Sequence, residues 1–381
     1  NFYSAFGQFR NTFASTLEAQ MKQLQFFADA RRYPSALHAA LAENEIPVEI
    51  YHNLIKAVHE NFPAMHRYMR LRKKLLGVDK LHYYDIYTPL VPDQDEEIPF
   101  AQAKEIALEA LAPLGEDYLS MLREGFSNRW IDVYENQGKR SGAYSSGIYG
   151  HHPFVLLNYT DTLNDVFTLV HEMGHALHSY LSGKNQSVTY ADYKIFVAEV
   201  ASTCNESLLM QHLLQNSTDP KRRAYLINYF LEQFRTTLYR QTMFAEFELW
   251  CSEQVRQGLP LTAESLCQKY GDLNRAYYGD AIEPDPEIAL EWARIPHFYR
   301  DFYVYQYATG FSAAIALSQR ILKEGAPAVS DYLRFLSGGC STDPVSLLRG
   351  AGVDMGTPAP VEDALRLFAD LVRQMEELAE A

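Results

Sequence analysis

Apolar side chains recur every three or four residues along most of this chain, which is the pattern of amphipathic helices. The opening stripe consists of Phe2, Phe6, Phe9, Phe13, Leu17, Met21 and Leu24. Further helical patterns lie at about 35–44, 47–76, 99–113 and 115–126. After one short strand they resume at about 162–182, 192–215, 220–257, 262–277, 298–323, 326–337 and 360–379. The pattern therefore predicts a mainly α fold.

The character of the sequence changes between residues 137 and 150, where four glycines and three serines occur in fourteen residues. This composition predicts a mobile loop over a cleft. The apolar run that follows predicts an edge strand at 154–158, to which an extended peptide could add. An exposed loop is also expected at the acidic run 93–97. We divide the chain at residue 137 into a helical region, 1–136, and a second, mainly helical region, 137–381.

The net charge of −14 disfavours nucleic acid and anionic membrane surfaces as partners, since both attract basic proteins. No run of about eighteen apolar residues predicts a membrane-spanning helix. The four cysteines form no close pair in the sequence, which favours free thiols in a reducing compartment. We therefore expect a cytoplasmic protein without nucleic-acid or membrane partners.

The strongest chemical signal is the run from His171 to His175. Two histidines four residues apart lie on one helical face, with a Cβ separation of about 5–6 Å that lets both reach one metal ion. Glu172 follows the first histidine and would lie beside the metal, where a bound water sits. We expect Asp161 to cap this helix and Gly183 to end it. Gly174 lowers helix propensity, which close packing against a neighbouring backbone would explain.

A catalytic zinc needs a third protein ligand and an open fourth position. His178 is two turns from His171, about 10 Å along the axis, and is too distant to share the ion. Glu199 lies in an apolar run on the following helix, where an uncompensated carboxylate would be expensive to bury. We therefore predict Glu199 as the third ligand, and Glu206, on the same face, as a brace for a ligating histidine.

These stretches resemble the oligoendopeptidase F family of the thimet-oligopeptidase group of zinc peptidases. The resemblance lies in 171–180, in the spacing to Glu199, and in the runs 140–145, 198–203, 295–299 and 302–310. It implies a mainly helical peptidase with a deep channel for short peptides and a small sheet beside the motif helix. Residues 1–136 would then form part of the channel wall, and residues 137–381 the catalytic zinc-binding region. It also implies that an N-terminal helical region of the family is missing here and is a possible partner of this chain.

The resemblance and the residue chemistry imply the same roles. One zinc ion would be held by His171, His175 and Glu199, and the water on its fourth position would attack a peptide carbonyl with Glu172 as general base. The resemblance places oxyanion donors in 297–307. By similarity we expect Tyr305 and His297 in that role, with packing as the alternative for each. Tyr299 and His152 are weaker candidates for contacts with substrate.

Two other functions remain open. A dipeptidyl carboxypeptidase can share the same ligand spacing but needs a cationic group for the substrate carboxylate, which the sequence does not locate. A non-catalytic peptide-binding scaffold could keep zinc as a structural element, although such sites usually have four protein ligands. The ligand set suits zinc well but does not distinguish it from cobalt or manganese.

Overall fold

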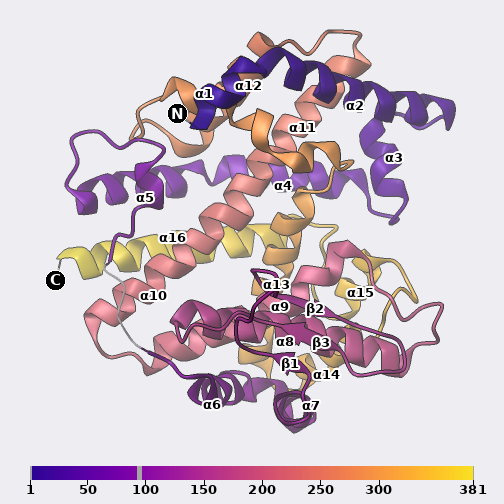
Figure 1. Cartoon of the computed structure of the whole chain (residues 1–381), viewed down its shortest axis with the longest axis vertical. Helices are drawn as coiled ribbons and strands as arrows, with labels where there is room; N and C mark the ends of the chain where they lie inside the picture. The colour runs from indigo at the N-terminus through magenta and orange to yellow at the C-terminus, as the bar shows by residue number, and fades with distance from the viewer. Residues whose placement is uncertain (1, 92–96, 381) are drawn as a thin grey trace. The chain divides into compact units, whose positions relative to one another are not determined.

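A computed structural model describes residues 2–91 and 97–380 of the chain (Figure 1). The fold is mainly α-helical with one small sheet, so the predicted fold class is confirmed. Of the expected acidic loop, residues 93–96 lie outside the described residues, and Glu97 is exposed and outside any helix. The chain divides into two compact units, 1–92 with 231–308 and 365–381, and 93–230 with 309–364. The functional division at residue 137 stays a prediction.

The first helices are α1 (Phe2–Gln8), α2 (Arg10–Ala30), α3 (Ala36–Ala42), α4 (Val48–Glu60), α5 (Phe62–Leu76), α6 (Phe100–Ala110) and α7 (Gly115–Ser127). The second group consists of α8 (Leu163–Asn185), α9 (Ile195–Asn216), α10 (Pro220–Gln233), α11 (Arg240–Arg256) and α12 (Ala263–Tyr278). The last are α13 (Tyr305–Glu324), α14 (Ala326–Leu336), α15 (Pro344–Gly350) and α16 (Ala359–Glu380). Short helical segments are η1 (Asp85–Tyr87), η2 (Ala112–Leu114), η3 (Phe234–Tyr239), η4 (Pro286–Arg294) and η5 (Pro296–Tyr299).

Several predicted helices are interrupted. The opening stripe divides at Phe9, which is 58% exposed, while Leu17 and Met21 are buried as expected. The helix expected at 47–76 breaks at Asn61 and restarts with a proline in its first turn, where the missing N–H costs no hydrogen bond. The helix expected at 220–257 contains the π-helical segment η3.

The helix predicted at 298–323 is wrong at its start, because α13 begins only at Tyr305. Residues 296–299 form the separate turn η5, and Asp301 and Phe302 have φ angles of 20° and 57°. Non-glycine residues with positive φ do not continue a right-handed helix. Tyr299 and Tyr303 therefore both precede α13 and do not share one helical face with Tyr307.

The sheet belongs to the second unit and has the strand order β1 (Ile131–Asp132), β3 (Phe154–Leu156), β2 (Tyr144–Ser146). β1 is parallel to β3 and β2 is antiparallel to it. The expected edge strand is thus the central strand β3, and the edge on the glycine-rich side belongs to β2. The expected loop at 137–150 contains this strand, which the sequence did not reveal because Tyr144, Ser145 and Ser146 show no alternation of apolar and polar residues.

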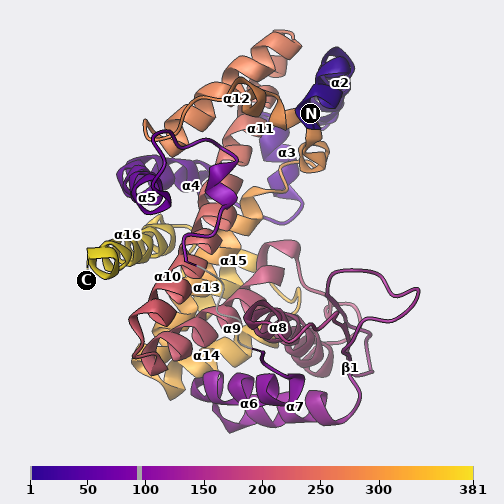
Figure 2. The ribbon, with the colours of Figure 1, turned by 60° about the vertical axis from the view of Figure 1, so that its left-hand side comes forward.

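Helices α8 and α9 pack along each other in the second unit, beside the sheet (Figure 1). Figure 2 shows α6 and α7 below α8 in the view, and both of these helices contact α8. Among the described residues, no helix is long and apolar enough to cross a bilayer.

The start and end of α8 differ from the prediction. Thr162, not Asp161, is the N-cap: its side chain accepts from the Asp165 N–H, and the Asp165 carboxylate accepts from the Thr162 N–H. This reciprocal pair is a capping box, which satisfies two backbone donors at the helix start. Asp161 lies outside with a φ of 62°, and Gly183 stays within the helix, which continues to Asn185.

Candidate metal centre

Close contact between α8 and α9 depends on Gly174. A Cβ atom at this position would lie 2.6 Å from the Ser202 Cα and 2.9 Å from the Ala201 carbonyl oxygen. These are backbone atoms, which cannot move away as a flexible side chain could. The prediction that Gly174 permits close packing against a neighbouring backbone is therefore confirmed. The contact fixes the separation of the helix that carries the histidines from the helix that carries Glu199.

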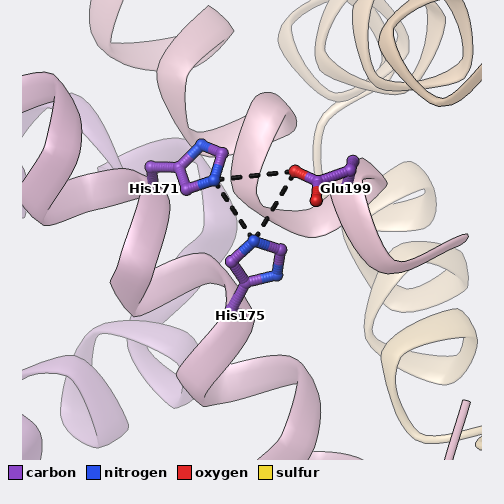
Figure 3. A group of neighbouring side chains, drawn as sticks. All are labelled: His171, His175 and Glu199. Carbon is purple, nitrogen blue, oxygen red and sulfur yellow. Dashed lines mark hydrogen bonds and ion pairs between the residues drawn. The ribbon is translucent and has the colours of Figure 1, made fainter. Parts of the chain in front are cut away.

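Three side chains meet between these helices (Figure 3). His171 and His175 point from adjacent turns of α8 toward Glu199 of α9. The two Nε2 atoms are 3.2 Å apart, and Glu199 Oε2 lies 3.6 Å from each. Their exposed fractions are 26%, 18% and 29%, so the group is reachable from solvent without lying on the open surface. The structure brings together the three residues that the sequence predicts as ligands.

The spacing of the three atoms fits a tetrahedral metal ion. Nitrogen and oxygen ligands about 2.0–2.2 Å from a tetrahedral zinc lie about 3.3–3.6 Å from one another. The observed separations of 3.2 and 3.6 Å agree with this value. Two imidazoles and one carboxylate are also a donor set that zinc favours. The arrangement leaves a fourth tetrahedral position without a protein ligand among the described residues.

Glu206 holds the outer nitrogen of His171. Its Oε1 atom and His171 Nδ1 form a short hydrogen bond. With the proton on Nδ1, the Nε2 lone pair is left for a metal, as in the carboxylate–histidine pairs of zinc sites. Burial lowers the pKa of His171, but the hydrogen bond and charge of Glu206, with the charges of Glu199 and Glu172, outweigh it and raise the pKa to about 9.

Glu172 lies on α8 next to the first histidine and is only 7% exposed. Burial is the largest influence on this carboxyl and raises its pKa, against the opposing charges of His171 and His175. For Glu199, burial acts in the same direction, but the hydrogen bond and charge of His175 and the charge of His171 lower its pKa overall. The two carboxyl groups therefore differ in their tendency to hold a proton, although they share one site.

Two residues that support the site were missed in the sequence. The Ser202 hydroxyl lies 3.0 Å from the Glu199 carbonyl oxygen and 3.4 Å from its Oε2, so it can orient the ligand. Asn205 is fully buried, and its amide donates to the Val170 carbonyl oxygen of α8 at 3.0 Å. The only available signal was their position, three and six residues after Glu199 on the same helix.

His178 does not join the metal-ligand group, as the sequence predicts. It is 1% exposed, and its ring stacks on Tyr193 with centroids 3.7 Å apart and an angle of 5° between the planes. Its Nδ1 atom has no hydrogen-bond partner among the described residues. Burial, with the nearby His175, lowers the pKa of His178 to about 3. This histidine is a neutral core residue.

The burial of neutral His178 predicts a loss of stability in acid. Its folded pKa lies below that of the unfolded chain, about 6.5, so only the unfolded chain takes up this proton. Stability is therefore lost as the pH falls from about 6.5 toward 3. Between pH 7.5 and pH 5, His178 should lower the free energy of unfolding by about 2 kcal/mol. We expect the free energy of unfolding of the His178→Leu variant to fall by about 2 kcal/mol less than that of the parent between pH 7.5 and 5. Urea unfolding at saturating zinc measures both values. Equal losses in the two proteins would contradict the assignment of His178 as a neutral core residue.

The sheet offers one free edge beside α8. Val155 and Leu157 of the central segment donate their N–H groups to the β1 side. In a strand the peptide groups alternate in direction, so those of Phe154 and Leu156 face β2. In β2, Ser145 lies between the two residues that pair with Phe154 and Leu156. Its N–H and C=O groups consequently point away from β3, toward the free edge of β2. Among the described residues, no strand pairs there.

The glycine-rich segment is attached to its surroundings at both ends. The Asn158 side-chain amide donates to the carbonyl oxygens of Arg140 and Gly142 at 2.9 and 2.7 Å. The Tyr149 hydroxyl donates to the carbonyl oxygen of Gln186, the residue that follows α8. The ring of His152, which precedes β3, stacks on that of Trp130, which precedes β1, with an angle of 3° between the ring planes. Its contact with substrate stays a prediction.

The aromatic segment 297–307 belongs to the other compact unit. His297, Tyr303 and Tyr307 form a ring cluster with centroids 5.5–6.2 Å apart. Tyr305 is 2% exposed and packs 5.0 Å from the Tyr51 ring, and burial raises its pKa. Tyr299 is 38% exposed, and its hydroxyl lies 2.8 Å from that of Thr16. The rings of Tyr303 and Tyr307 thus both lie beside that of His297.

Comparison with known proteins agrees with this geometry. The sequence profile described as Peptidase family M3 matches residues 1–367. The oligopeptidase PepF of Bacillus subtilis is 53% identical over 99% of this chain, and an oligoendopeptidase F homolog of Lactococcus lactis is 45% identical over 99%. This chain spans 56% and 63% of the lengths of those two proteins.

Solved structures show the same relationship. The crystal structure of oligoendopeptidase-F from Enterococcus faecium matches all of this chain and 62% of its own, with 43% identity and a TM-score of 0.81. PZ peptidase A shares the fold at a TM-score of 0.76 over 97% of this chain and 67% of its own, although the identity is only 19%. Because the family profile matches residues 1–367, nearly the whole chain, this chain belongs to peptidase family M3.

Proposed function

We propose that this chain carries the catalytic centre of a zinc-dependent endopeptidase that cleaves internal bonds of short peptides. The observation that carries the proposal is the spacing of His171 Nε2, His175 Nε2 and Glu199 Oε2, at 3.2–3.6 Å, with a buried carboxyl on the residue after His171. Membership of peptidase family M3 supports the reaction class.

In the proposed hydrolysis each residue of the site has a separate role. A zinc ion held by the three ligands would lower the pKa of a water molecule and polarise the substrate carbonyl. Glu172 would accept a proton as water attacks the carbonyl carbon, and would return it to the leaving amine. Glu206 would keep His171 in the tautomer that presents Nε2, and the Ser202 hydroxyl would hold the Glu199 carboxylate in place.

The free edge of β2 is suited to an extended peptide. The peptide groups of Ser145 face this edge, and β2 contacts α8, the helix that carries both histidines. A substrate strand paired there would be held mainly through its own main chain, which tolerates many sequences. The sheet is the one that the sequence predicted for this role, but the strand is different, and we now assign the role to β2.

Donors to the developing oxyanion would come from the aromatic segment that contains His297 and Tyr305, the two residues that the family resemblance suggests. Hydrogen bonds that strengthen as charge develops on the oxygen are worth about 10²–10³ in rate. The substrates would be short unstructured peptides, and an N-terminal region of the kind implied by the resemblance would be a partner. A cytoplasmic location also stays part of the proposal.

Peptides with blocked ends test the position of cleavage. We expect the zinc-loaded protein to cut a C-terminally amidated oligopeptide at an internal bond, because the proposed site needs no free substrate carboxylate. Mass spectrometry of the products identifies the bond. Cleavage restricted to peptides with a free carboxyl end, with release of dipeptides, would instead show a dipeptidyl carboxypeptidase. Binding of both peptides without hydrolysis would show a scaffold.

A further inference from the structure

The aromatic segment 297–307 is held in place by three helices of its own compact unit. The Phe298 ring lies 5.1 Å from that of Phe247 on α11. On another side, Tyr51 of α4 packs 5.8 Å from Phe302 and 5.0 Å from Tyr305. From α2, Gln20 donates to the Asp301 carboxylate at 3.3 Å. The segment between η5 and α13 is therefore positioned by specific side chains, although it has no regular secondary structure.

One contact reaches the backbone of this segment. Oε1 of Glu248, on α11, accepts a hydrogen bond of 2.7 Å from the Phe302 N–H. Phe302 has a φ of 57°, which is rare and costly for a bulky residue. It follows Asp301, also at positive φ, and it immediately precedes Tyr303. The bonded N–H thus belongs to the turn that sets the direction in which the chain enters α13.

We propose that Glu248 is a positioning residue for the reaction: it holds the Asp301–Phe302 turn and thereby aligns His297 and the tyrosines that follow the turn. This inference rests on the proposed function, because it assumes that the aromatic segment supplies the oxyanion donors. Glu248 itself would touch neither substrate nor metal. It would act through the backbone of Phe302 alone.

A carboxyl group is an expensive choice at this position. Glu248 is fully buried, and its Oε2 atom has no hydrogen-bond partner among the described residues. A buried polar atom without a partner destabilises the folded state, so the carboxyl group is not explained by packing alone. Burial also raises the pKa of Glu248 well above its usual value, against the opposing hydrogen bond from Phe302, and so favours the neutral carboxyl. The contact that remains to explain it is the bond to Phe302.

Three substitutions separate the hydrogen bond from the charge and the volume of the side chain. Glu248→Gln keeps an acceptor at the same reach and resembles the neutral carboxyl. Glu248→Asp keeps the carboxyl but shortens the reach by one methylene group, and Glu248→Met keeps the volume but removes the acceptor. We expect kcat on an oligopeptide to stay within about threefold for the glutamine variant. For the other two it should fall by tenfold or more, toward the roughly 10²-fold cost of a misplacement of about 1 Å.

Hydrogen exchange of the Phe302 amide provides a readout that does not depend on activity. It should quicken by at least tenfold in Glu248→Asp and Glu248→Met and stay slow in Glu248→Gln, while bound zinc is unchanged in all three. As a matched control, Cys251→Ala removes another fully buried side chain from α11 and should lower the melting temperature without changing kcat.

The outcomes distinguish this inference from the proposed function. Faster exchange with an unchanged kcat would overturn the positioning role of Glu248 and leave the peptidase assignment intact. A glutamine variant as impaired as the methionine variant would also overturn it, because the acceptor would then not be the decisive group. Failure of the unsubstituted zinc-loaded protein to cleave any peptide would count against the proposed function itself, while the exchange rates would still report whether Glu248 holds the turn.

Discussion

Replacing Glu172 with glutamine is expected to lower peptide hydrolysis by about 10²–10⁴-fold, the usual contribution of a general base. The amide has almost the same shape but cannot accept the proton that water must lose. Because Glu172 is not among the three ligand residues, zinc should remain bound. Peptide turnover and zinc content, measured on the same preparation, test both statements.

The zinc measurement decides how a loss of activity is interpreted. If turnover falls and zinc remains, the proton-transfer role of Glu172 is supported. Unchanged turnover in a zinc-loaded Glu172→Gln protein would contradict the mechanism. A loss of zinc in parallel with activity would show instead that Glu172 helps to hold the metal.

The second large effect is expected at Gly174. In Gly174→Ala the new methyl group would lie 2.6 Å from the Ser202 Cα, so α8 and α9 must separate. Alanine gains about 1 kcal/mol of helix propensity, but forced separation of packed backbones typically costs about 1–3 kcal/mol. The separation would also move Glu199 away from the two histidines. We therefore expect lower stability together with weaker zinc binding, measured by thermal unfolding and zinc titration.

Gly183 provides the matched control, because it lies in the same helix and a Cβ there would meet no atom within 4 Å. Gly183→Ala should be neutral or stabilising by up to about 1 kcal/mol and should leave zinc affinity unchanged. Equal behaviour of the two alanine variants would show that helix contact at Gly174 does not set the geometry of the metal centre.

The metal centre was predictable because its signals are local. Helical periodicity fixes the relative direction of His171 and His175, and the cost of burying a lone carboxylate distinguishes Glu199 from a surface acid. Gly174 was informative for the same reason, since it lowers the propensity of a helix that packing must then stabilise. The structure accordingly brings His171, His175 and Glu199 together on the two helices that the sequence predicts, while their role as ligands stays a prediction.

Features that depend on tertiary contacts were not predictable in the same way. β2 consists of Tyr144, Ser145 and Ser146, which show no apolar alternation, so its pairing with β3 determines that it is a strand. The start of α13 depends on positive φ angles at Asp301 and Phe302, and these residue types do not predict such angles. The backbone N–H of Phe302 in this turn donates to Glu248, a buried acid of α11. The sequence does not predict this contact, because it joins two segments that are far apart along the chain.

Zinc-dependent hydrolysis at the three-residue site is tested most directly by removing and restoring the metal. We predict about one zinc ion per chain, cleavage of an internal bond in an amidated peptide, loss of both after chelation, and recovery of both when zinc returns. Glu199→Gln should bind zinc weakly and cleave poorly under the same conditions. Full activity after complete removal of metal, or unchanged zinc binding in Glu199→Gln, would contradict zinc catalysis at this site.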